Sequence, residues 1–476
     1  MTAPSRAPAA PAAAPERLDP ALLKTSFVLV LGPILALLDT TIVGVGLDAV
    51  ARDLGGPVTT LQWVSAGYLL AISMVMPLAG WASDRFGART MWMTSVALFT
   101  AGSALCGLAW SAGSLIAFRV LQGIGGGLIQ PIGQSIVVRA AGPKRLGRVF
   151  GVTVLPLTFA PVLGPVLGGL IVERLDWRWM FLVNVPLGLL TLVLAARYVP
   201  AFAGAAAGAA RRLDVRGLAL LSPGLAAVVY GFSEVGTAGF GAARVIAPLA
   251  AGTALLAGYG VHALRRRGTA LIDLALFARR GFAVATANSF LQGAALYSSM
   301  LLLPLYYQQV EHVSALDAGL LLAPQALATA VVTLLASRLA DRMAPRPLIL
   351  TGIAVTVAGT LAFTQVGSHP AGWLLVLSLM LRGAGLAMVM APGMAAVYAS
   401  VRPDETARAA GAVNTVNRVG GSLGTAVLAV VLQRSLGHHS PAAAYGATFW
   451  WVVGLSALTL IPAFFYPSRD SRKERA

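Results

Sequence analysis

One of the 18 acidic residues of the chain stands apart because it lies deep inside a long apolar segment. Asp39 is seven residues from the far end of the segment 25–46, about 10 Å along a helix. Arg119 lies at the same depth in the segment 112–138, which runs in the opposite direction. A carboxylate at this depth costs roughly 2.5–3.5 kcal/mol on insertion scales, so it is expected to face a partner or an aqueous cavity. We therefore predict that Asp39 pairs with Arg119, either as a proton-dependent switch or as a structural ion pair.

A stripe of polar residues and glycines runs along the segment that carries Arg119. At 100° per residue its members share an arc of about 120° on a helix: Arg119, Gln122, Gly123, Gly126, Gln130, Gly133 and Gln134. Shorter polar stripes recur in the second half of the chain. Such stripes predict the lining of an aqueous cavity, with these candidates: Gln122, Gly123, Gln130, Gln134, Asn288, Gln292, Asn414 and Asn417. For Gln130 and Gln134, hydrogen bonds between helices are an equal alternative.

Other kinds of chemistry find little support in the sequence. A P-loop requires glycine directly before its lysine, but Lys24, Lys144 and Lys473 follow Leu, Pro and Arg. We therefore expect no cofactor and an ion gradient as the energy source. His312 and Asp317 have the His-x4-Asp spacing of some acyltransferases, in a short loop where a chance match is the better explanation.

Metal and disulfide chemistry are not expected either. The remaining histidines lie at helix ends or in loops without a carboxylate cluster: His262, His369, His438 and His439. The single cysteine, Cys106, cannot form a disulfide framework. The sequence predicts no metal site, and a polytopic membrane enzyme is an unfavoured alternative because no catalytic constellation reaches a common depth.

The composition indicates which elements position these residues. Apolar residues make up 57% of the chain, charged residues 11%, and the mean hydropathy is +0.77, whereas a soluble domain has roughly 25% charged residues. The sequence predicts an all-α polytopic membrane protein with fourteen helices that are long enough to cross a ~30 Å hydrocarbon core. The predicted spans are 25–46, 60–81, 91–110, 112–138, 149–172, 178–198, 217–233, 245–264, 282–307, 315–337, 348–366, 371–399, 410–433 and 447–466.

The basic residues give the orientation of these helices. Of the 35 Lys and Arg residues, 27 fall in the tails and alternate loops, 5 in the opposite loops and 3 in helices. This bias predicts that both termini are cytoplasmic, in the cytoplasmic (inner) membrane. It also accounts for the net charge of +17 without nucleic-acid binding.

Internal similarity divides the chain into two halves. Residues 121–133 (LQGIGGGLIQPIG) align with residues 381–393 (LRGAGLAMVMAPG) at an offset of 260, and the loop 83–89 aligns with 340–346 at an offset of 257. Duplicated bundles with a cavity between them are typical of secondary transporters. The predicted organisation is a disordered cytoplasmic tail (1–24), a six-helix bundle (25–198), a linker with two extra helices (199–281), a second six-helix bundle (282–466) and a cytoplasmic tail (467–476).

Several motifs together resemble the major facilitator superfamily, specifically its fourteen-spanning drug:proton antiporters. They are LDTTIV (38–43) in the first helix, GWASDRFGAR (80–89) in the loop after the second, RVLQGIGG (119–126), the antiporter motif GPVLGG (164–169), and WRWMF (177–181) with NVP (184–186). The resemblance covers almost the whole chain after the tail. Two departures are the sequence after Val43, which lacks the usual Asn and Ala-Leu-Pro ending, and Pro345, which replaces a glycine in the second loop copy.

The resemblance implies roles for these residues. Asp39 and Arg119 would couple transport to protons, and an inner gate would comprise Gly80, Asp84, Arg85, Gly87, Arg89, Asp341 and Arg342, pairing across the seam between the halves. Gly164, Pro165, Gly168 and Gly169 would form the antiporter motif, in which Gly164 and Gly168 allow close packing against the opposite half and Pro165 favours a bend.

The function implied is a proton-coupled antiporter that exports small hydrophobic, drug-like compounds and acts as a monomer in the lipid bilayer. Dedicated export of a single metabolite or lipid stays open. A channel is disfavoured, because one Asp–Arg pair in one half suits rocking motion better than a selectivity ring.

Overall fold

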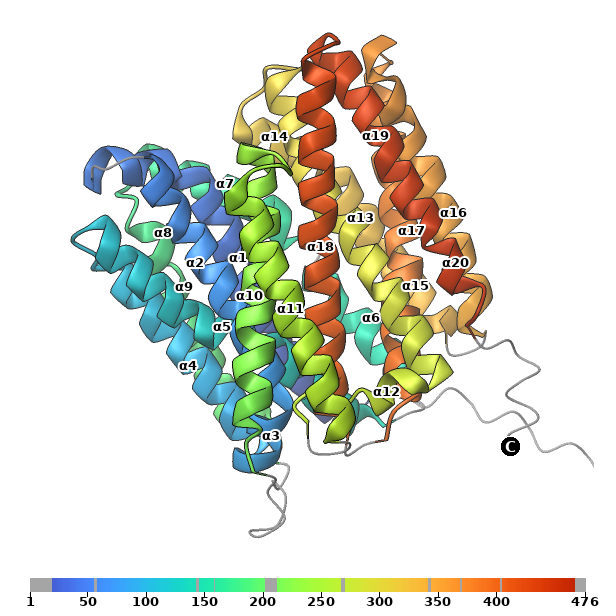
Figure 1. Ribbon diagram of the computed structural model, residues 1–476. Coiled ribbons are helices and arrows are strands. Elements are labelled where there is room, and N and C mark those ends of the chain that lie inside the picture. The colour runs from blue at the N-terminus through green and yellow to red at the C-terminus, as the bar shows by residue number, and fades with distance from the viewer. Residues whose placement is uncertain are drawn as a thin grey trace, which may run out of the picture.

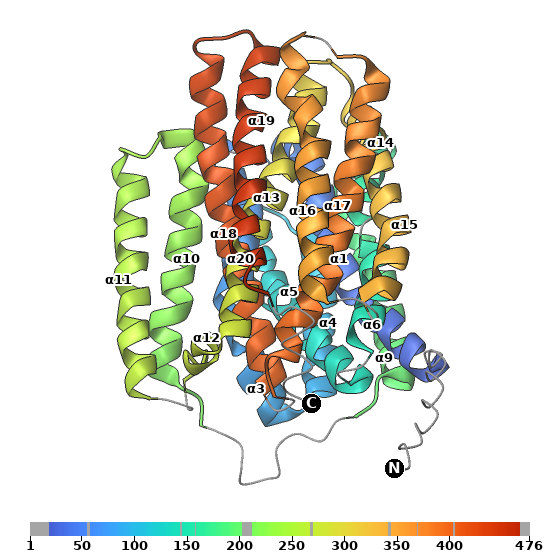
Figure 2. The ribbon, with the colours of Figure 1, turned by 90° about the vertical axis from the view of Figure 1, so that its right-hand side faces the viewer.

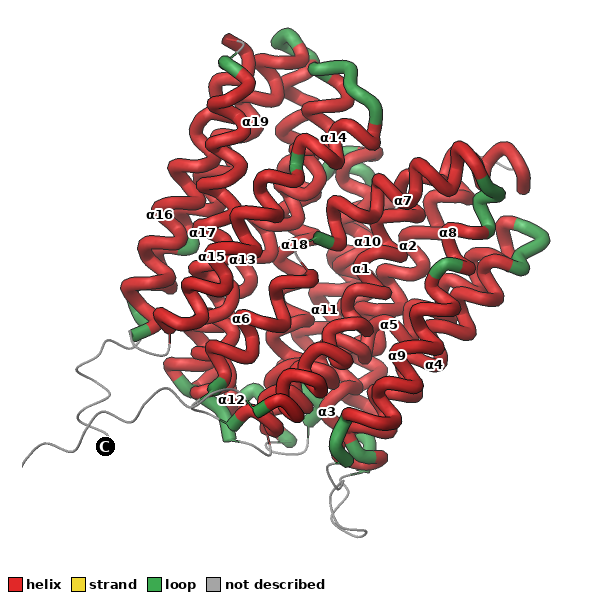
Figure 3. The backbone as a smooth tube through the Cα atoms, turned by 180° about the vertical axis from the view of Figure 1, so that it is seen from behind, coloured by secondary structure: helices red, strands yellow, loops and turns green. Residues whose placement is uncertain are grey.

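The computed structural model describes residues 19–54, 58–142, 145–157, 159–201, 212–266, 270–340, 344–368, 370–402 and 405–466, and this part of the chain contains helices and no strand (Figure 3). Residues 1–18 and 467–476 of the predicted tails lie outside these residues, whereas residues 20–24 of the predicted disordered tail already belong to the first helix, which corrects that boundary. The helices stand side by side along one common direction (Figures 1 and 2).

Residues 25–198 (the N-terminal half) form the first group of helices. Its elements are α1 (Pro20–Leu54), α2 (Val58–Val75), the 3-10 helix η1 (Met76–Leu78), α3 (Ala79–Phe86), α4 (Ala88–Gly107), α5 (Ala112–Ala141), α6 (Leu146–Leu157), α7 (Ala160–Arg174), α8 (Trp179–Leu182) and α9 (Asn184–Tyr198). Local sequence sets several of their limits. Ser111 caps α5 through a reciprocal bond with Ser114, and Gly87, with φ of +86°, makes the turn between α3 and α4 that glycine tolerates.

Two further helices follow, and then the C-terminal half (residues 282–466). The pair is α10 (Val215–Ala238), capped by Asp214, and α11 (Ala243–Arg265). The later elements are α12 (Ala275–Ala278), α13 (Arg280–Gln309), α14 (Ala315–Leu321), α15 (Ala323–Ala340), α16 (Pro345–Leu361), η2 (Ala362–Ser368), α17 (Gly372–Ala399), α18 (Thr406–Leu436), α19 (Pro441–Leu458) and α20 (Leu460–Ala463).

Eleven described helices are long and apolar enough to cross a membrane. They match eleven of the fourteen predicted spans. The other three are 91–110 and 282–307, where helices α4 and α13 occur but fall outside that group, and 149–172, which is divided between α6 and α7. Helix α7 runs through Pro165, and the bend expected at that residue stays a prediction. The interruption lies earlier, between Leu157 and Ala160.

Contacts group the connecting segments at two ends of the molecule. At one end, Arg89 donates to the carbonyl of Ala196 and Thr25 donates to the carbonyl of Tyr198. The start of the first helix and the loop 83–89 therefore both meet the end of the helix 184–198. We call this the basic end; it also contains α3 and α12 (Figure 2). At the opposite end, Arg178 reaches Asp53 of α1. Arg89 and Arg178 therefore lie at opposite ends, and the wider division of positive charge stays a prediction.

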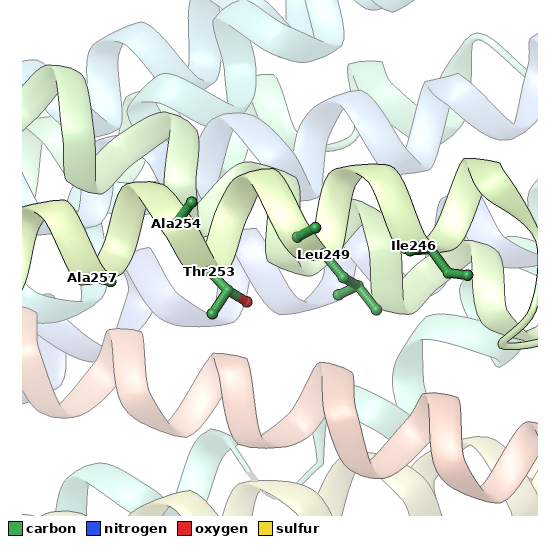
Figure 4. Close-up of a pocket in the computed structure, with 6 residues that line it drawn as sticks. Ile246, Leu249, Thr253, Ala254 and Ala257 are labelled. Carbon is green, nitrogen blue, oxygen red and sulfur yellow. The ribbon is translucent and has the colours of Figure 1, made fainter.

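The helices α10 and α11 pack on each other, and α10 also contacts α2 and α18. In Figure 2 this pair stands beside the rest of the molecule, with α11 outermost. One face of α11 forms an open, largely apolar groove of about 560 Å³ (Figure 4). It is lined by Ile246, Leu249, Ala250, Thr253, Ala254 and Ala257.

Candidate functional site

The carboxylate of Asp39 lies in a buried polar cluster of the N-terminal half. Arg119 Nη1 lies 2.5 Å from Asp39 Oδ2. The amide nitrogens of Gln122 and Asn184 donate to Asp39 Oδ1 at 2.8 and 3.0 Å. The Asp39 side chain is 0% exposed, so these donors replace water around the charge. The predicted pairing of Asp39 with Arg119 is confirmed.

The guanidinium of Arg119 is held from several directions. Its Nε donates a 3.0 Å hydrogen bond to the Val64 carbonyl of α2, and its Nη1 lies 2.8 Å from Gln122 Oε1. Its Cζ lies 4.0 Å from the centre of the Tyr68 ring, which is a cation–π distance. Helices α1, α2 and α5 therefore converge on one ion pair.

Asn184 is a member of this cluster that the sequence did not predict. The sequence presents it only as part of the NVP motif, yet its amide bridges Asp39 and Ser103 Oγ, the latter at 3.1 Å. Ser103 in turn donates to the Phe181 carbonyl, and Cys106 Sγ lies 3.7 Å from Gln122 Oε1. The only sequence feature that could have indicated this role is the position of the Asn184 amide near the start of the apolar segment 178–198. Helices α4 and α9 thus complete the enclosure.

Two predicted cavity residues do not line an open cavity. Gln122 is fully buried, and both polar atoms of its amide are used within the Asp39 cluster. Gly123 packs against α2, where an added Cβ would lie 2.6 Å from the Tyr68 carbonyl oxygen. The polar arc on α5 therefore serves an enclosed ion pair near Arg119. Further along α5, Gln130 is exposed.

Gln134 makes a hydrogen-bonded bridge between the halves. Its Oε1 accepts from Asn414 Nδ2 of α18 at 2.7 Å and from the Tyr398 hydroxyl of α17 at 3.0 Å. The Tyr398 ring also stacks on Phe150 of α6 at a centroid distance of 5.7 Å. Of the two predicted roles for Gln134, the structure shows the hydrogen bond between helices.

The remaining candidates of the second half lie within that half. Asn417 donates a 2.8 Å hydrogen bond to the Ser289 carbonyl of α13. Asn288 and Gln292 of α13 each have a buried side-chain atom without a hydrogen-bond partner, Oδ1 and Nε2. Asn417 therefore joins α18 to α13, while the cavity-lining role of Asn288 and Gln292 stays a prediction.

The antiporter motif lies on α7, which packs on α1 of its own half and on α14 of the C-terminal half. A Cβ at Gly164 would overlap Thr41 of α1, two residues from Asp39. The nearest neighbour of Gly164 is thus in its own half, while α7 also contacts α14 of the C-terminal half, and the role of Gly164 in packing against that half stays a prediction. Gly168 is buried, whereas Gly169 has open space around its Cβ position.

The gate motif lies at the basic end. Asp84 Oδ1 is 3.8 Å from Arg139 Nη2, and Arg89 donates to the Ala196 carbonyl, both within the N-terminal half. Arg85 is exposed. The contact across the seam is made by Gly80, where an added Cβ would overlap Arg408 of α18. Asp341 and Arg342 lie outside the described residues.

Ion pairs at the two ends of the bundle change the pKa of their carboxyl groups. At the basic end, Arg279 Nη1 and Nη2 donate to Glu405 Oε2 and Oε1 at 2.6 and 2.9 Å. These hydrogen bonds hold the pKa of Glu405 below its usual value. At the opposite end, hydrogen bonds from the Trp177 indole and then from Arg178 lower the pKa of Asp53. Across the residues that the structure describes, no group of three or more His, Cys, Asp or Glu side chains could hold a metal ion.

The described residues form a helical bundle with eleven helices that are long and apolar enough to cross a membrane and with a buried Asp–Arg pair in the N-terminal half, which is the architecture of a polytopic membrane protein. The chain belongs to the Major Facilitator Superfamily, whose family model matches residues 29–425 and 285–476.

Curated relatives and solved structures agree with this assignment. The chain is 37% identical over 505 residues to the Multidrug resistance protein B homolog of Mycobacterium tuberculosis (strain ATCC 25618 / H37Rv), covering 97% of this chain and 93% of the relative. It is 31% identical over 418 residues to the Tetracenomycin C resistance and export protein of Streptomyces glaucescens, covering 88% and 77%.

The solved structures share the fold. The proton:xylose symporter XylE aligns with a TM-score of 0.66 at 17% identity over 93% of this chain and 94% of its own. The human organic anion transporter MFSD10 (TETRAN) aligns with a TM-score of 0.62 at 19% identity, over 94% and 100%. Family and relatives together indicate a transporter rather than an enzyme.

Proposed function

We propose that the protein is a proton-coupled antiporter that exports small hydrophobic, drug-like compounds across the cytoplasmic membrane by alternating access. The observation that carries the proposal is the buried carboxylate of Asp39, which is held by Arg119, Gln122 and Asn184. In this proposal fourteen helices span the membrane, both termini are cytoplasmic, and the protein works as a monomer without a cofactor.

Proton coupling would follow from the arrangement around Asp39. Protonation neutralises the carboxylate and removes its attraction to Arg119, which stays charged because arginine does not lose its proton in proteins. The freed guanidinium can then adjust against Tyr68 and the Val64 carbonyl of α2. Because α2 leads through η1 and α3 to the Gly80–Arg408 contact, a shift of α2 would reach the seam between the halves.

The drug class is supported by the relatives named above, one of which is called a multidrug resistance protein homolog. The name of the Streptomyces relative joins resistance and export to one compound, tetracenomycin C. This name favours, as a second candidate, an exporter dedicated to a single metabolite.

Transport by purified protein in proteoliposomes tests the proposal. An imposed pH difference should drive a hydrophobic dye against its own gradient, and dissipating the pH difference should stop this movement. A panel of chemically unrelated substrates separates the two candidates. Movement that ignores the pH difference would reject proton coupling, and selectivity for one compound would favour the dedicated exporter.

A further inference from the structure

The C-terminal half contains a buried positive charge that the transport proposal does not use. Arg382 lies within α17, and its side chain is 1% exposed. It donates a 3.3 Å hydrogen bond to Thr360 Oγ1 of α16, while its Nε is buried without a partner. A guanidinium has five N–H donors and stays protonated, so most of its hydrogen-bonding capacity is unused.

The described helices around Arg382 supply no counter-charge. The elements that pack most against α17 are α6, α13, α15, α16, α18 and η2. None of these six contains an Asp or a Glu. Within the described ranges Arg382 forms no salt bridge. A buried ion without a partner costs several kcal/mol, and this cost calls for an anion that is not part of the chain.

The internal repeat shows what the side chain that corresponds to Arg382 does in the N-terminal half. Gly102 of α4 packs against the Gln122 backbone, with its Cβ position 2.7 Å from Gln122 Cα, and the corresponding Gly359 of α16 packs against the Arg382 backbone. At the same offsets, Thr360 corresponds to Ser103 and Arg382 to Gln122. In the N-terminal half, the side chain at this position donates to an anionic oxygen of Asp39. In the C-terminal half a stronger donor, arginine, takes the same place.

We propose that Arg382 and Thr360 form a binding site for a small monovalent anion, a halide or a small carboxylate, between α16 and α17. The guanidinium supplies the charge and the N–H donors. The Thr360 hydroxyl donates to the Thr356 carbonyl at 2.8 Å and accepts from Arg382, so it positions the guanidinium beside the anion. The close helix crossing at Gly359 limits the occupant to a small ion. The site lies in the half opposite to Asp39 and is independent of the proposed proton coupling.

Thermal unfolding of the purified full-length protein in detergent tests the site. Sodium chloride or sodium formate would replace sodium gluconate at constant ionic strength. We expect the unfolding midpoint to rise saturably by about 3–5 °C with either small anion. Arg382→Gln, which places the residue of the other repeat here, should abolish the rise. Arg434→Gln removes an exposed arginine and should retain it. A wild-type midpoint that does not respond, or a rise that persists in Arg382→Gln, would overturn the site.

Direct binding to the wild-type protein keeps the proposal testable if Arg382→Gln does not fold. Radiolabelled chloride and radiolabelled formate should show saturable binding near one ion per chain. Displacement of chloride by formate would define a site for small carboxylates as well as halides, and its absence would define a halide site. Saturable binding of neither ion would reject the proposal while leaving the transport proposal untouched.

Discussion

Asn414 Nδ2 of α18 donates a 2.7 Å hydrogen bond to Gln134 Oε1 of α5, and this bond joins the two halves of the chain. Loss of Gln134 leaves the amide of Asn414 with only its bond to the Ala410 carbonyl and leaves the Tyr398 hydroxyl without its acceptor. Burying unpaired polar groups costs about 1–3 kcal/mol, so Gln134→Leu should loosen the seam.

Cysteine labelling measures this loosening. In a Cys106→Ser background, a cysteine introduced at the buried position Ala410 should react about tenfold faster with a maleimide when Gln134→Leu is present. Gln309→Leu removes a bond to Tyr445 within the C-terminal half and should leave the rate unchanged. Equal rates in wild type and Gln134→Leu would show that the bridge does not hold the seam.

The contact between Gly164 and Thr41 predicts strong sensitivity to one methyl group. Gly164→Ala places a Cβ against Thr41 and should cost about 1–3 kcal/mol of overpacking strain. Because Thr41 is two residues from Asp39 on α1, transport should fall more than protein abundance. Gly169→Ala enters open space and should be neutral.

A compensating change makes this prediction specific. Thr41→Gly removes both the hydroxyl and the Cβ that an added methyl group would meet, so it should partly restore transport to Gly164→Ala. If the rescue failed, or if transport and protein abundance fell equally, Gly164 would contribute only to helix packing and not specifically to transport.

The pair between Arg279 and Glu405 predicts a defined pH dependence of stability. The pKa of Glu405 is lowered from 4.5 by the Arg279 hydrogen bond, so the pair stabilises the folded protein above that pH. Its contribution is lost as the pH falls through the depressed folded-state value. Arg279→Gln should lower the free energy of unfolding by about 1 kcal/mol at neutral pH.

Thermal unfolding midpoints between pH 8 and pH 3.5 check the sign. The difference between wild type and Arg279→Gln should be constant from pH 8 to about pH 5.5 and shrink below pH 4.5. Arg434→Gln serves as the control for loss of an exposed charge. A difference that grows in acid would contradict the assignment.

The sequence predicts the ion pair well, because helix rise alone sets the depth of Asp39 and Arg119. The polar arc on α5 shows which face of the helix is polar, but it does not show whether that face meets water or a neighbouring helix. The sequence therefore predicts a cavity position for Gln122, whose amide instead hydrogen-bonds to Asp39. For the same reason the GPVLGG motif indicates a close contact without identifying Thr41 as the partner.

Interruptions of helices depend on where a proline falls in the helix. Pro165 lies inside α7, whereas the break falls where Pro156 lies near the end of α6 and Pro161 in the first turn of α7. Proline is well tolerated in a first helical turn.

The sequence does not predict Asn184 as a hydrogen-bond donor to Asp39, because the approach of the two side chains depends on how α9 packs on α1. Hydrophobic periodicity does not report that packing.

Asn184 should contribute to transport through its bond to Asp39. Asn184→Ala removes one of the two donors to Asp39 Oδ1, and a hydrogen bond to a charged group is worth about 1.5–3 kcal/mol. We expect ΔpH-driven transport to fall severalfold, because Gln122 still holds the same oxygen. Thr191→Ala, which alters a buried residue of the same helix that bonds only to the Leu187 carbonyl, is the control. Transport by Asn184→Ala equal to that of the control would exclude a role in coupling.

The central prediction concerns Asp39 and Arg119 themselves. Asp39→Asn keeps the shape of the side chain and an oxygen for the Arg119 guanidinium, but it cannot bind and release a proton. It should abolish uphill movement driven by a pH difference in proteoliposomes while leaving substrate binding and downhill exchange. Asp53→Asn, at the end of the same helix and outside the cluster, should transport normally.

Arg119→Lys should lower the rate of ΔpH-driven transport about tenfold or more, because an ammonium lacks the planar fork that reaches Asp39, Gln122 and the Val64 carbonyl together. Full ΔpH-driven efflux by Asp39→Asn would place the proton elsewhere and leave the buried pair with a structural role.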